Sequence, residues 1–374
     1  MHYDDLISEK ARLVDASGIR KVFDLAAKLP DPINLSIGQP HFDVPDPIKD
    51  ACVAAIRSGF NSYTQTQGYG PLREQLAAGL TAELGWPDPA VLVTSGVSGG
   101  LLLAAMALLN PGDEVLIADP FFVMYKHLVN LVGGVPVAVD TYPDFTLDPD
   151  KFAAKITPRT KLIMVNSPAN PTGAVADNAQ LAGLRALADQ HGLLIVSDEI
   201  YNEFCYDRPY VSAGKFGPAN GTLLLRGFSK TYGMTGWRMG YAAGPKAIIE
   251  QMTKLQQYTF VCAPSMAQKA TLAALTVDMS GYIAEYRRKR DLIYAALKDD
   301  FEVVRPGGAF YIFPKAPGGS GAAFCQAAIA NNVLIIPGNV FSSRDTHFRI
   351  SFAAPDDKLR AGAEILCRLA QEMR

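Results

Sequence analysis

The sequence has little of what marks a secreted, metal-binding or nucleic-acid-binding protein. Among its 374 residues, 35 Lys and Arg face 37 Asp and Glu, so no basic excess is available to hold nucleic acid or an anionic membrane. The five cysteines stand singly, without a C-x-x-C pair or a neighbouring His, which excludes the common zinc motifs and favours reduced thiols. The start, MHYDDLISEK, lacks the basic and apolar regions of a signal peptide. We expect a cytoplasmic protein with no metal, nucleic-acid or membrane partner.

Long hydrophobic runs are also missing. Residues 89–112 carry no charged side chain, but their continuous apolar run is about half of the ~20 residues that a membrane span needs. Small residues, Thr and Ser interrupt this stretch, so we expect a buried strand, a turn and a buried helix there.

Short apolar runs are frequent, and they indicate the fold class. Runs of four or five residues without polar alternation are typical of strands covered on both faces. Seven occur, at 91–94, 115–118, 135–139, 161–165, 193–197, 222–226 and 239–243, mostly with helical patterns between them. They predict an α/β layered domain with a mostly parallel sheet, bounded near Pro45 and Gly281. The helical patterns include 46–59, 70–84 and 177–192.

After residue 281 the pattern changes. A long charged helix over 281–299 leads into strands that alternate with turns, which predicts a smaller α+β unit. Because clustered basic residues on a helix usually form a solvated face, we expect no chemistry from Arg287, Arg288 and Arg290.

One short motif offers a nucleophile. Residues 96–100 (GVSGG) fit G-x-S-x-G between a strand and a helix, the setting of an α/β-hydrolase nucleophile, which would be Ser98. The other interpretation is a tight turn whose free backbone N–H groups bind an anion at the helix N-terminus. An acid and a downstream histidine would be needed to support the hydrolase.

Residues 227–240 (GFSKTYGMTGWRMG) give a stronger signal. Lys230 follows an apolar strand, where desolvation pushes an amine toward its neutral, nucleophilic form. Arg238, set among glycines, can offer a planar fork to a phosphate. Taken alone, the two residues are better explained as a solvated lysine and a surface arginine.

Two further strands end in polar residues of the kind that bind ligands. Asp198 closes one apolar run and Tyr201 follows three residues later, so both can face one pocket at the carboxyl edge of the sheet. Asn170 lies between Pro168 and Pro171, whose X-Pro bonds rigidify the turn. A helix cap for Asp198 and a turn former for Asn170 are the alternative interpretations.

In this order these residues resemble a known family, the class I/II, fold-type I pyridoxal-phosphate aminotransferases. The resemblance covers nearly the whole chain, from INLSIGQPHFDVP (33–45) to FRISFA (348–353), and GFSKTYGMTGWRMG matches the lysine signature of the family. Its members have Ser at the position of Gly227 in many cases, so this chain is expected to depend more on other phosphate ligands. The resemblance implies an aspartate-aminotransferase-like fold, with a large domain at 46–281 and a small domain formed by 1–45 and 282–374.

The resemblance also implies roles around pyridoxal 5′-phosphate. Lys230 is the lysine that binds the cofactor as a Schiff base and then moves a proton. Asp198 pairs with the ring nitrogen, Tyr201 and Asn170 donate to the ring oxygen, and Phe122 stacks on the ring. The phosphate is held by Gly96, Val97, Ser98, Arg238 and, across a homodimer interface, Tyr63.

For the substrate, the resemblance implies that Arg349 and the backbone of Gly38 bind the α-carboxylate of an L-amino acid or 2-oxo acid in a ping-pong transamination. A carbon–sulfur β-lyase on the same fold is the alternative, and a regulatory cofactor-binding module is a third. Arg20 is a candidate reader of the substrate side chain by its position alone.

Overall fold

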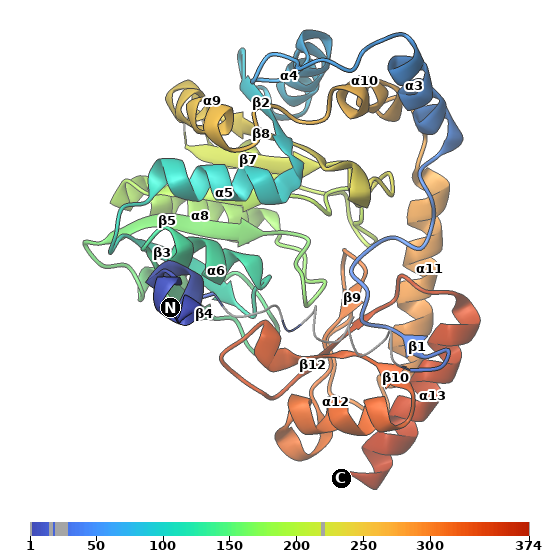
Figure 1. Cartoon of the computed structure of the whole chain (residues 1–374). Helices are drawn as coiled ribbons and strands as arrows, with labels where there is room; N and C mark the ends of the chain where they lie inside the picture. Colours follow the sequence, from blue (N-terminus) through green and yellow to red (C-terminus); the bar gives the residue numbers. More distant parts are fainter. Residues whose placement is uncertain (1, 15–17, 19–28, 218–220, 374) are drawn as a thin grey trace.

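A large central sheet organises the molecule. The computed structural model describes residues 2–14, 18, 29–217 and 221–373, and within them seven strands form this sheet in the order β2-β8-β7-β6-β5-β3-β4 (Figure 1). All neighbours pair in parallel except β8, which is antiparallel to β2 and β7. The strands are β2 (Ala90–Ser95), β3 (Glu114–Asp119), β4 (Val135–Asp140), β5 (Thr160–Asn166), β6 (Leu194–Asp198), β7 (Thr222–Gly227) and β8 (Met239–Gly244). Each lies within about one residue of an apolar run in the sequence, so the predicted α/β class is confirmed.

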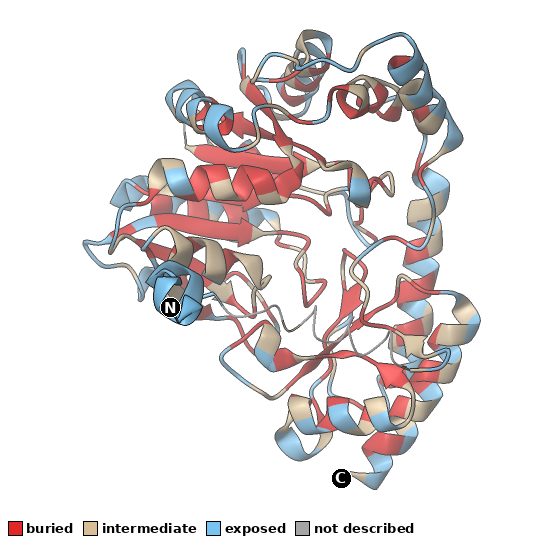
Figure 2. Cartoon of the chain, viewed as in Figure 1, coloured by how far each residue is buried: buried red, intermediate tan, exposed pale blue. Residues whose placement is uncertain are grey.

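Helices cover both faces of this sheet. Alternate strand residues point to opposite faces, so Leu162 and Met164 of β5 pack into one core while Ile163 and Val165 pack into another. The first core joins α5 (Gly96–Leu108), α6 (Met124–Leu131) and α9 (Lys246–Thr259), and the second joins α7 (Pro149–Ala153) and α8 (Asn178–His191). Figure 2 shows the buried strands between helices whose outer surfaces are exposed. This double cover explains why the strands read as continuous apolar runs.

The remaining helices include those expected near residues 46–59, 70–84 and 281–299. They are α1 (Glu9–Arg12), α3 (Asp46–Arg57), α4 (Gly70–Leu84), α10 (Ser265–Ala274), α11 (Ser280–Leu297), α12 (Gly321–Ala330) and α13 (Asp356–Glu372). Short 3₁₀ turns lie at Tyr3–Leu6, Ala213–Phe216, Thr235–Trp237, Pro317–Gly319 and Gly338–Val340. Residues 89–112 form strand β2 and helix α5, as expected. Over the described ranges, none of the helices has the length and apolar character needed to cross a membrane.

Two small sheets bring the chain ends together. Strand β1 (Ile33–Asn34) pairs in parallel with β10 (Val333–Leu334). The strands β11 (Ile336–Pro337), β12 (Phe348–Ser351) and β9 (Tyr311–Ile312) form an antiparallel sheet beside them. Figure 1 shows these elements below the large sheet, with α11 running alongside both parts. The division into domains at residues 45 and 281 stays a prediction.

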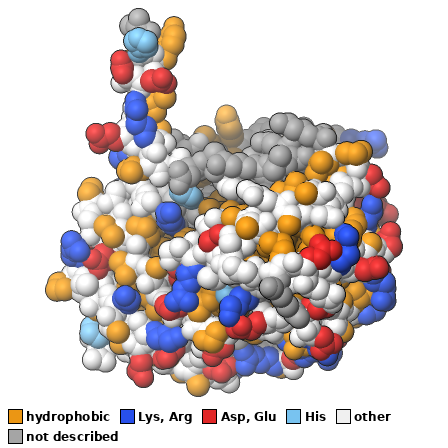
Figure 3. Space-filling model, turned by 90° about the horizontal axis from the view of Figure 1, so that it is seen from below, with side chains coloured by type: hydrophobic (Ala, Val, Ile, Leu, Met, Phe, Trp, Pro, Cys, Tyr) orange, Lys and Arg blue, Asp and Glu red, His pale blue; other side chains and the backbone are white. Residues whose placement is uncertain are grey.

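The amino-terminal segment, residues 2–14, lies away from β1. Its helix α1 touches α6, and the segment stands out from the body of the molecule (Figures 1 and 3). Tyr3, Leu6 and Leu13 in this segment are 60% exposed or more. Acidic and basic side chains are interspersed over the face in Figure 3.

The interpretation of the basic residues of α11 was wrong for one of them. Arg288 is half exposed, as expected for a solvated face, but Arg290 is fully buried and bonded to Asp207. The reason is helical periodicity: Arg290 lies four residues after the buried Tyr286 and three before the buried Ile293. Its carboxylate partner comes from the loop after β6, which the sequence of the helix alone does not reveal.

Candidate active site

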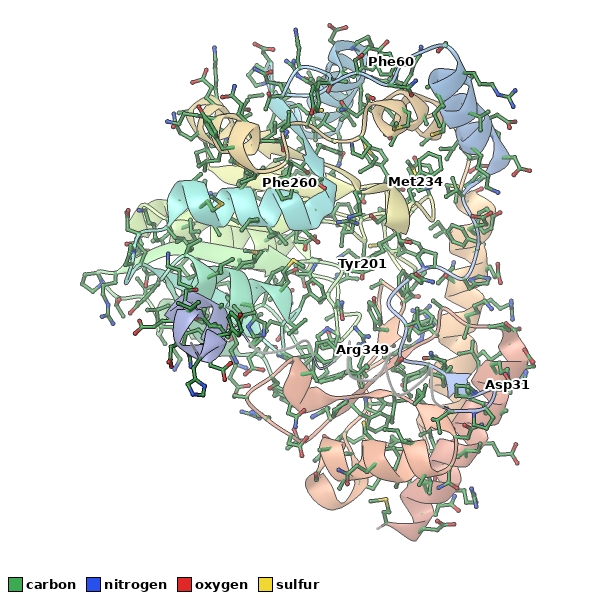
Figure 4. All side chains as sticks on the ribbon, in the orientation of Figure 1. Asp31, Phe60, Tyr201, Met234, Phe260 and Arg349 are labelled. Atoms are coloured by element: carbon green, nitrogen blue, oxygen red, sulfur yellow. The ribbon has the colours of Figure 1, made fainter. Side chains whose placement is uncertain are left out.

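A cavity of about 320 Å³ opens at the carboxyl ends of β5, β6 and β7. Figure 4 shows Tyr201, from the segment after β6, and Arg349, from β12, lying between the large sheet and the smaller unit. Ten of the twelve residues expected at the site line this cavity: Gly38, Val97, Ser98, Phe122, Asn170, Asp198, Tyr201, Lys230, Arg238 and Arg349. Open α/β sheets bind ligands at this edge.

The other two expected residues lie outside the lining. Gly96 adjoins it, since a Cβ atom on this glycine would lie 2.5 Å from Arg238 Nη2. Tyr63 lies in the loop between α3 and α4, and 83% of its surface is exposed. Arg20 lies outside the described residues.

Lys230 stands in the turn after β7, where the ammonium group is poorly solvated. Its Nζ donates to the carbonyl of Gly38 at 2.7 Å. Burial lowers the pKa of this lysine to about 8, helped by the charges of Arg349 and Arg238 and opposed by Asp198. The side chain is partly exposed, and it lines the cavity. At neutral pH a useful fraction of the amine is therefore neutral.

Asp198, the last residue of β6, is buried beside the cavity. Its Oδ2 accepts a hydrogen bond from the hydroxyl of Tyr125 at 2.8 Å, and its Oδ1 accepts one from the backbone N–H of Ile200 at 3.2 Å. Burial raises the pKa of Asp198 to about 6, and these two donors oppose the rise. A carboxylate offers about four acceptor positions, so Asp198 retains capacity for the N–H of a ligand.

Arg349 is the least expected charge in the molecule, because it is 1% exposed and has no carboxylate partner among the described residues. Its guanidinium lies between the rings of Tyr311 and Phe341, 4.4 and 4.7 Å from their centroids. It donates to Asn170 Oδ1 and to the carbonyl of Ser36, while Nε has no partner. Burying an uncompensated cation is costly, so this geometry fits an anionic ligand.

A second anion site forms at the N-terminus of α5. Gly96 has a positive φ of 66°, which lets the chain turn from β2 into the helix and leaves backbone N–H groups free at the cavity. Arg238 reaches the same place, and its hydrogen bonds to described residues go to the carbonyl oxygens of Thr235 and Ser95. Cation and helix dipole together suit a phosphate group.

Gly227, noted in the sequence for its missing hydroxyl, is explained by packing. A Cβ atom there would lie 2.9 Å from Ile200 Cδ1 and 3.0 Å from Val97 Cγ2. Two other hydroxyl-bearing residues, Ser229 and Thr235, line the cavity instead.

The described residues exclude the hydrolase interpretation of Ser98. None of the residues that line the cavity is a histidine. His347, a histidine downstream of Ser98, stacks on Phe313 with ring centroids 5.1 Å apart, and burial lowers its pKa to about 4. Ser98 therefore has no histidine base at this cavity, and the anion-binding interpretation of residues 96–100 stands.

Sequence reasoning missed Tyr125 and Tyr311. Tyr125 lies three residues after Phe122, which was expected at the site. Helical spacing places both side chains on one face, and this spacing was the available signal. Tyr311 is on the two-residue strand β9, and its hydroxyl is 2.9 Å from that of Tyr201. No local pattern marks Tyr311, because its position depends on pairing with β12.

Both peptide bonds at Pro168 and Pro171, which frame Asn170, are cis.

The comparisons identify the class of protein. Residues 30–366 match the family model described as aminotransferase class I and II. Together with the lysine, carboxylate and arginine that meet in the cavity, this match shows that the chain belongs to the class I and II aminotransferases.

Its relatives are similar over nearly their full length. A protein of Methanocaldococcus jannaschii named probable aspartate aminotransferase is 38% identical, over 96% of this chain and 99% of its own. The aspartate/prephenate aminotransferase of Thermus thermophilus is 38% identical, over 93% and 94%. Among solved structures, the aspartate aminotransferase from Thermus thermophilus with maleate superposes with a TM-score of 0.93 at 34% identity, covering 97% of this chain and 99% of that one.

Proposed function

We propose that this aminotransferase uses pyridoxal 5′-phosphate to move an amino group from an L-amino acid to a 2-oxo acid, with Lys230 as its catalytic residue. The observation that carries the proposal is the convergence of Lys230, Asp198 and the unpaired Arg349 on one cavity. The residues present fit the cofactor, since the cavity offers an amine, a carboxylate and a phosphate-sized anion site at once. When bound, the cofactor supplies a protonated pyridine ring that accepts electrons from the substrate.

Each residue at the cavity then has a distinct task. Lys230 holds the cofactor through Nζ and, once released, moves the proton at the substrate Cα. Its lowered pKa of about 8 suits a general base near neutral pH. Asp198 accepts the N–H of the ring. Tyr201 and Asn170 bind the ring oxygen, Phe122 covers the ring face, and Gly96, Val97, Ser98 and Arg238 bind the phosphate.

The substrate is held by its α-carboxylate. Arg349 binds it with the guanidinium edge that includes the unpartnered Nε, and the backbone of Gly38, which lines the same cavity, binds it as well. Among the described residues that line the cavity, Lys230, Arg238 and Arg349 are the cations, and each has a task in this scheme.

We further propose a homodimer in which Tyr63 reaches the phosphate of the partner's cofactor. Tyr63 is 83% exposed in the single chain, and the projecting segment 2–14 exposes Tyr3, Leu6 and Leu13, which favours coverage by a second copy. None of the five cysteines forms a disulfide bond within the described residues, which favours the cytoplasm.

A half-reaction tests the proposal. Purified protein loaded with pyridoxal phosphate should show visible absorption, and added L-glutamate should convert the cofactor to its amine form while 2-oxoglutarate accumulates. Lys230→Ala should lose both signals, and the exposed Lys246→Ala should keep both. Visible absorption that survives in Lys230→Ala, or release of ammonia in place of amino transfer, would refute the assignment.

A further inference from the structure

Tyr125 contacts two separate parts of the candidate site. It is the second residue of α6, its side chain is 2% exposed, and it borders the cavity. Its hydroxyl donates to Asp198 Oδ2 at 2.8 Å. Its ring meets the ring of Phe122 edge to face, with centroids 5.7 Å apart and planes at 80°. Hydroxyl and ring therefore hold different partners, and substitution can separate the two.

The direction of the hydrogen bond is fixed by the chemistry of its two ends. Burial raises the pKa of the Tyr125 phenol well above its usual value, and the adjacent Asp198 charge adds to that rise, so the hydroxyl keeps its proton and acts as the donor. A neutral donor at 2.8 Å favours the ionised form of a carboxylate. The same bond also fixes the carboxylate plane, because Oδ1 is held by the N–H of Ile200.

Asp198 needs such a donor because its surroundings disfavour its charge. The groups that face it are Tyr125 from α6, Glu199 and Tyr201 from the segment after β6, and Lys230 after β7. Burial is the largest effect and raises the pKa of Asp198 to about 6, and Glu199 adds to the rise. Lys230 opposes it only while the amine carries a proton, whereas the Tyr125 hydroxyl opposes it at every pH that a native enzyme meets.

We propose that Tyr125 is a positioning residue that keeps Asp198 ionised and aimed at the ring nitrogen of the cofactor. This inference rests on the proposed function, because it assumes that Asp198 meets a ring N–H. It assigns to Tyr125 a hydroxyl task that acts through Asp198 and a ring task that steadies Phe122. A tyrosine that only filled space in the core would not change the preference of the site for a ligand with a ring nitrogen.

The test uses two ligands that differ at one atom. Pyridoxal phosphate has the ring nitrogen, and its 1-deaza analogue has C–H there. In cofactor-free Tyr125→Phe, affinity for pyridoxal phosphate should fall about tenfold, the equivalent of about one pKa unit, while affinity for the analogue should change less than about twofold. Equal losses for both ligands would overturn the inference. In an Asp198→Asn background, Tyr125→Phe should have no further effect on the ratio of the two affinities.

A pH profile gives an independent readout. Capture of pyridoxal phosphate by the wild type should weaken as pH falls through about 6, where Asp198 becomes protonated. Removing the Tyr125 hydroxyl raises the pKa of Asp198, so this loss should begin at a higher pH, by about one unit, in Tyr125→Phe. If Tyr125→Phe and the wild type lose pyridoxal phosphate at the same pH, the proposed effect of the Tyr125 hydroxyl on Asp198 is contradicted.

Tyr206→Phe is the matched control. Tyr206 is also buried, and its hydroxyl bonds the carbonyl of Ala309 outside the cavity lining. It should leave the ratio of affinities and the pH profile unchanged, and thermal melting of each variant verifies folding. If the wild type itself captures no pyridoxal phosphate, the proposed function fails. If only the Tyr125→Phe differences are missing, the function stands and the inference fails.

Discussion

At the scale of single residues, the site holds buried positive charges that no neighbouring carboxylate neutralises. Arg349 has no carboxylate partner among the described residues, and Lys230 bonds a neutral carbonyl. Elsewhere the protein treats buried charge differently: Arg226 is bonded to both Glu199 and Glu83. A buried cation without an anion lowers stability unless a ligand completes it. Lys230 and Arg349 therefore serve ligand binding rather than folding stability.

This reasoning predicts that Lys230→Met stabilises the cofactor-free protein. The pKa of Lys230 is lowered to about 8 in the folded chain, against an ordinary value of 10.5. The unfolded chain thus binds more protons between these two values, and wild-type stability should rise with pH across that window. Below pH 8 the full penalty applies, so Lys230→Met should gain about 3 kcal/mol at pH 7, and the gain should disappear near pH 10.5.

Urea unfolding of both proteins at several pH values measures this gain. The exposed Lys246→Met should differ from wild type by less than about 0.5 kcal/mol throughout. A gain for Lys230→Met that is the same at every pH would mean that packing, and not the charge, is responsible.

At the scale of elements, sequence reasoning was reliable where the signal is local. Most residues of β5 are buried apolar residues, so the run at 161–165 identifies this strand without its neighbours. The edge strand β4 is buried mainly at Val139, but its apolar run also predicted it. The strand β9 has two residues and exists only through its pairing with β12, so nothing local predicts it or the position of Tyr311. The same limit explains Arg290, whose partner Asp207 is distant in sequence.

The turn from β2 into α5 gives a prediction at this scale. Gly96→Ala adds a Cβ atom 2.5 Å from Arg238 Nη2, at a φ of 66° that alanine adopts poorly. It should cost about 1 to 2 kcal/mol of stability and displace Arg238. Affinity for pyridoxal phosphate should fall about tenfold or more, while affinity for pyridoxal, which has no phosphate, should fall much less.

Gly79→Ala is the matched control for this change. Gly79 lies inside α4, and a Cβ atom there meets nothing within 4 Å. Alanine should stabilise that helix by up to about 1 kcal/mol and leave both affinities unchanged. Equal affinity losses for the two ligands in Gly96→Ala would show that the turn does not serve the phosphate.

At the scale of the whole molecule, the cavity collects residues from both ends of the chain. The carbonyl of Ser36 accepts a hydrogen bond from Arg349, and the carbonyl of Gly38 accepts one from Lys230. The pairing of β1 with β10 holds the segment that contains Ser36 and Gly38 near the cavity. The family resemblance was enough to predict this convergence for Gly38 and Arg349. It was not enough to place Tyr63, because in the single chain this side chain projects into solvent.

Mixing two defective variants, Lys230→Ala and Tyr63→Ala, tests whether Tyr63 acts across an interface. Lys230→Ala should be inactive, and Tyr63→Ala should bind pyridoxal phosphate about tenfold more weakly, as expected for a lost hydrogen bond to a charged group. In a mixed dimer, the site with intact Lys230 receives Tyr63 from the partner, so one site of two is complete. Random co-assembly makes half of the dimers mixed, and each mixed dimer has one complete site. About a quarter of all sites in the mixture should therefore have full cofactor affinity. If Tyr63 serves its own chain, or if the protein is a monomer, no site regains both residues, and titration of the mixture with pyridoxal phosphate would show weak sites alone.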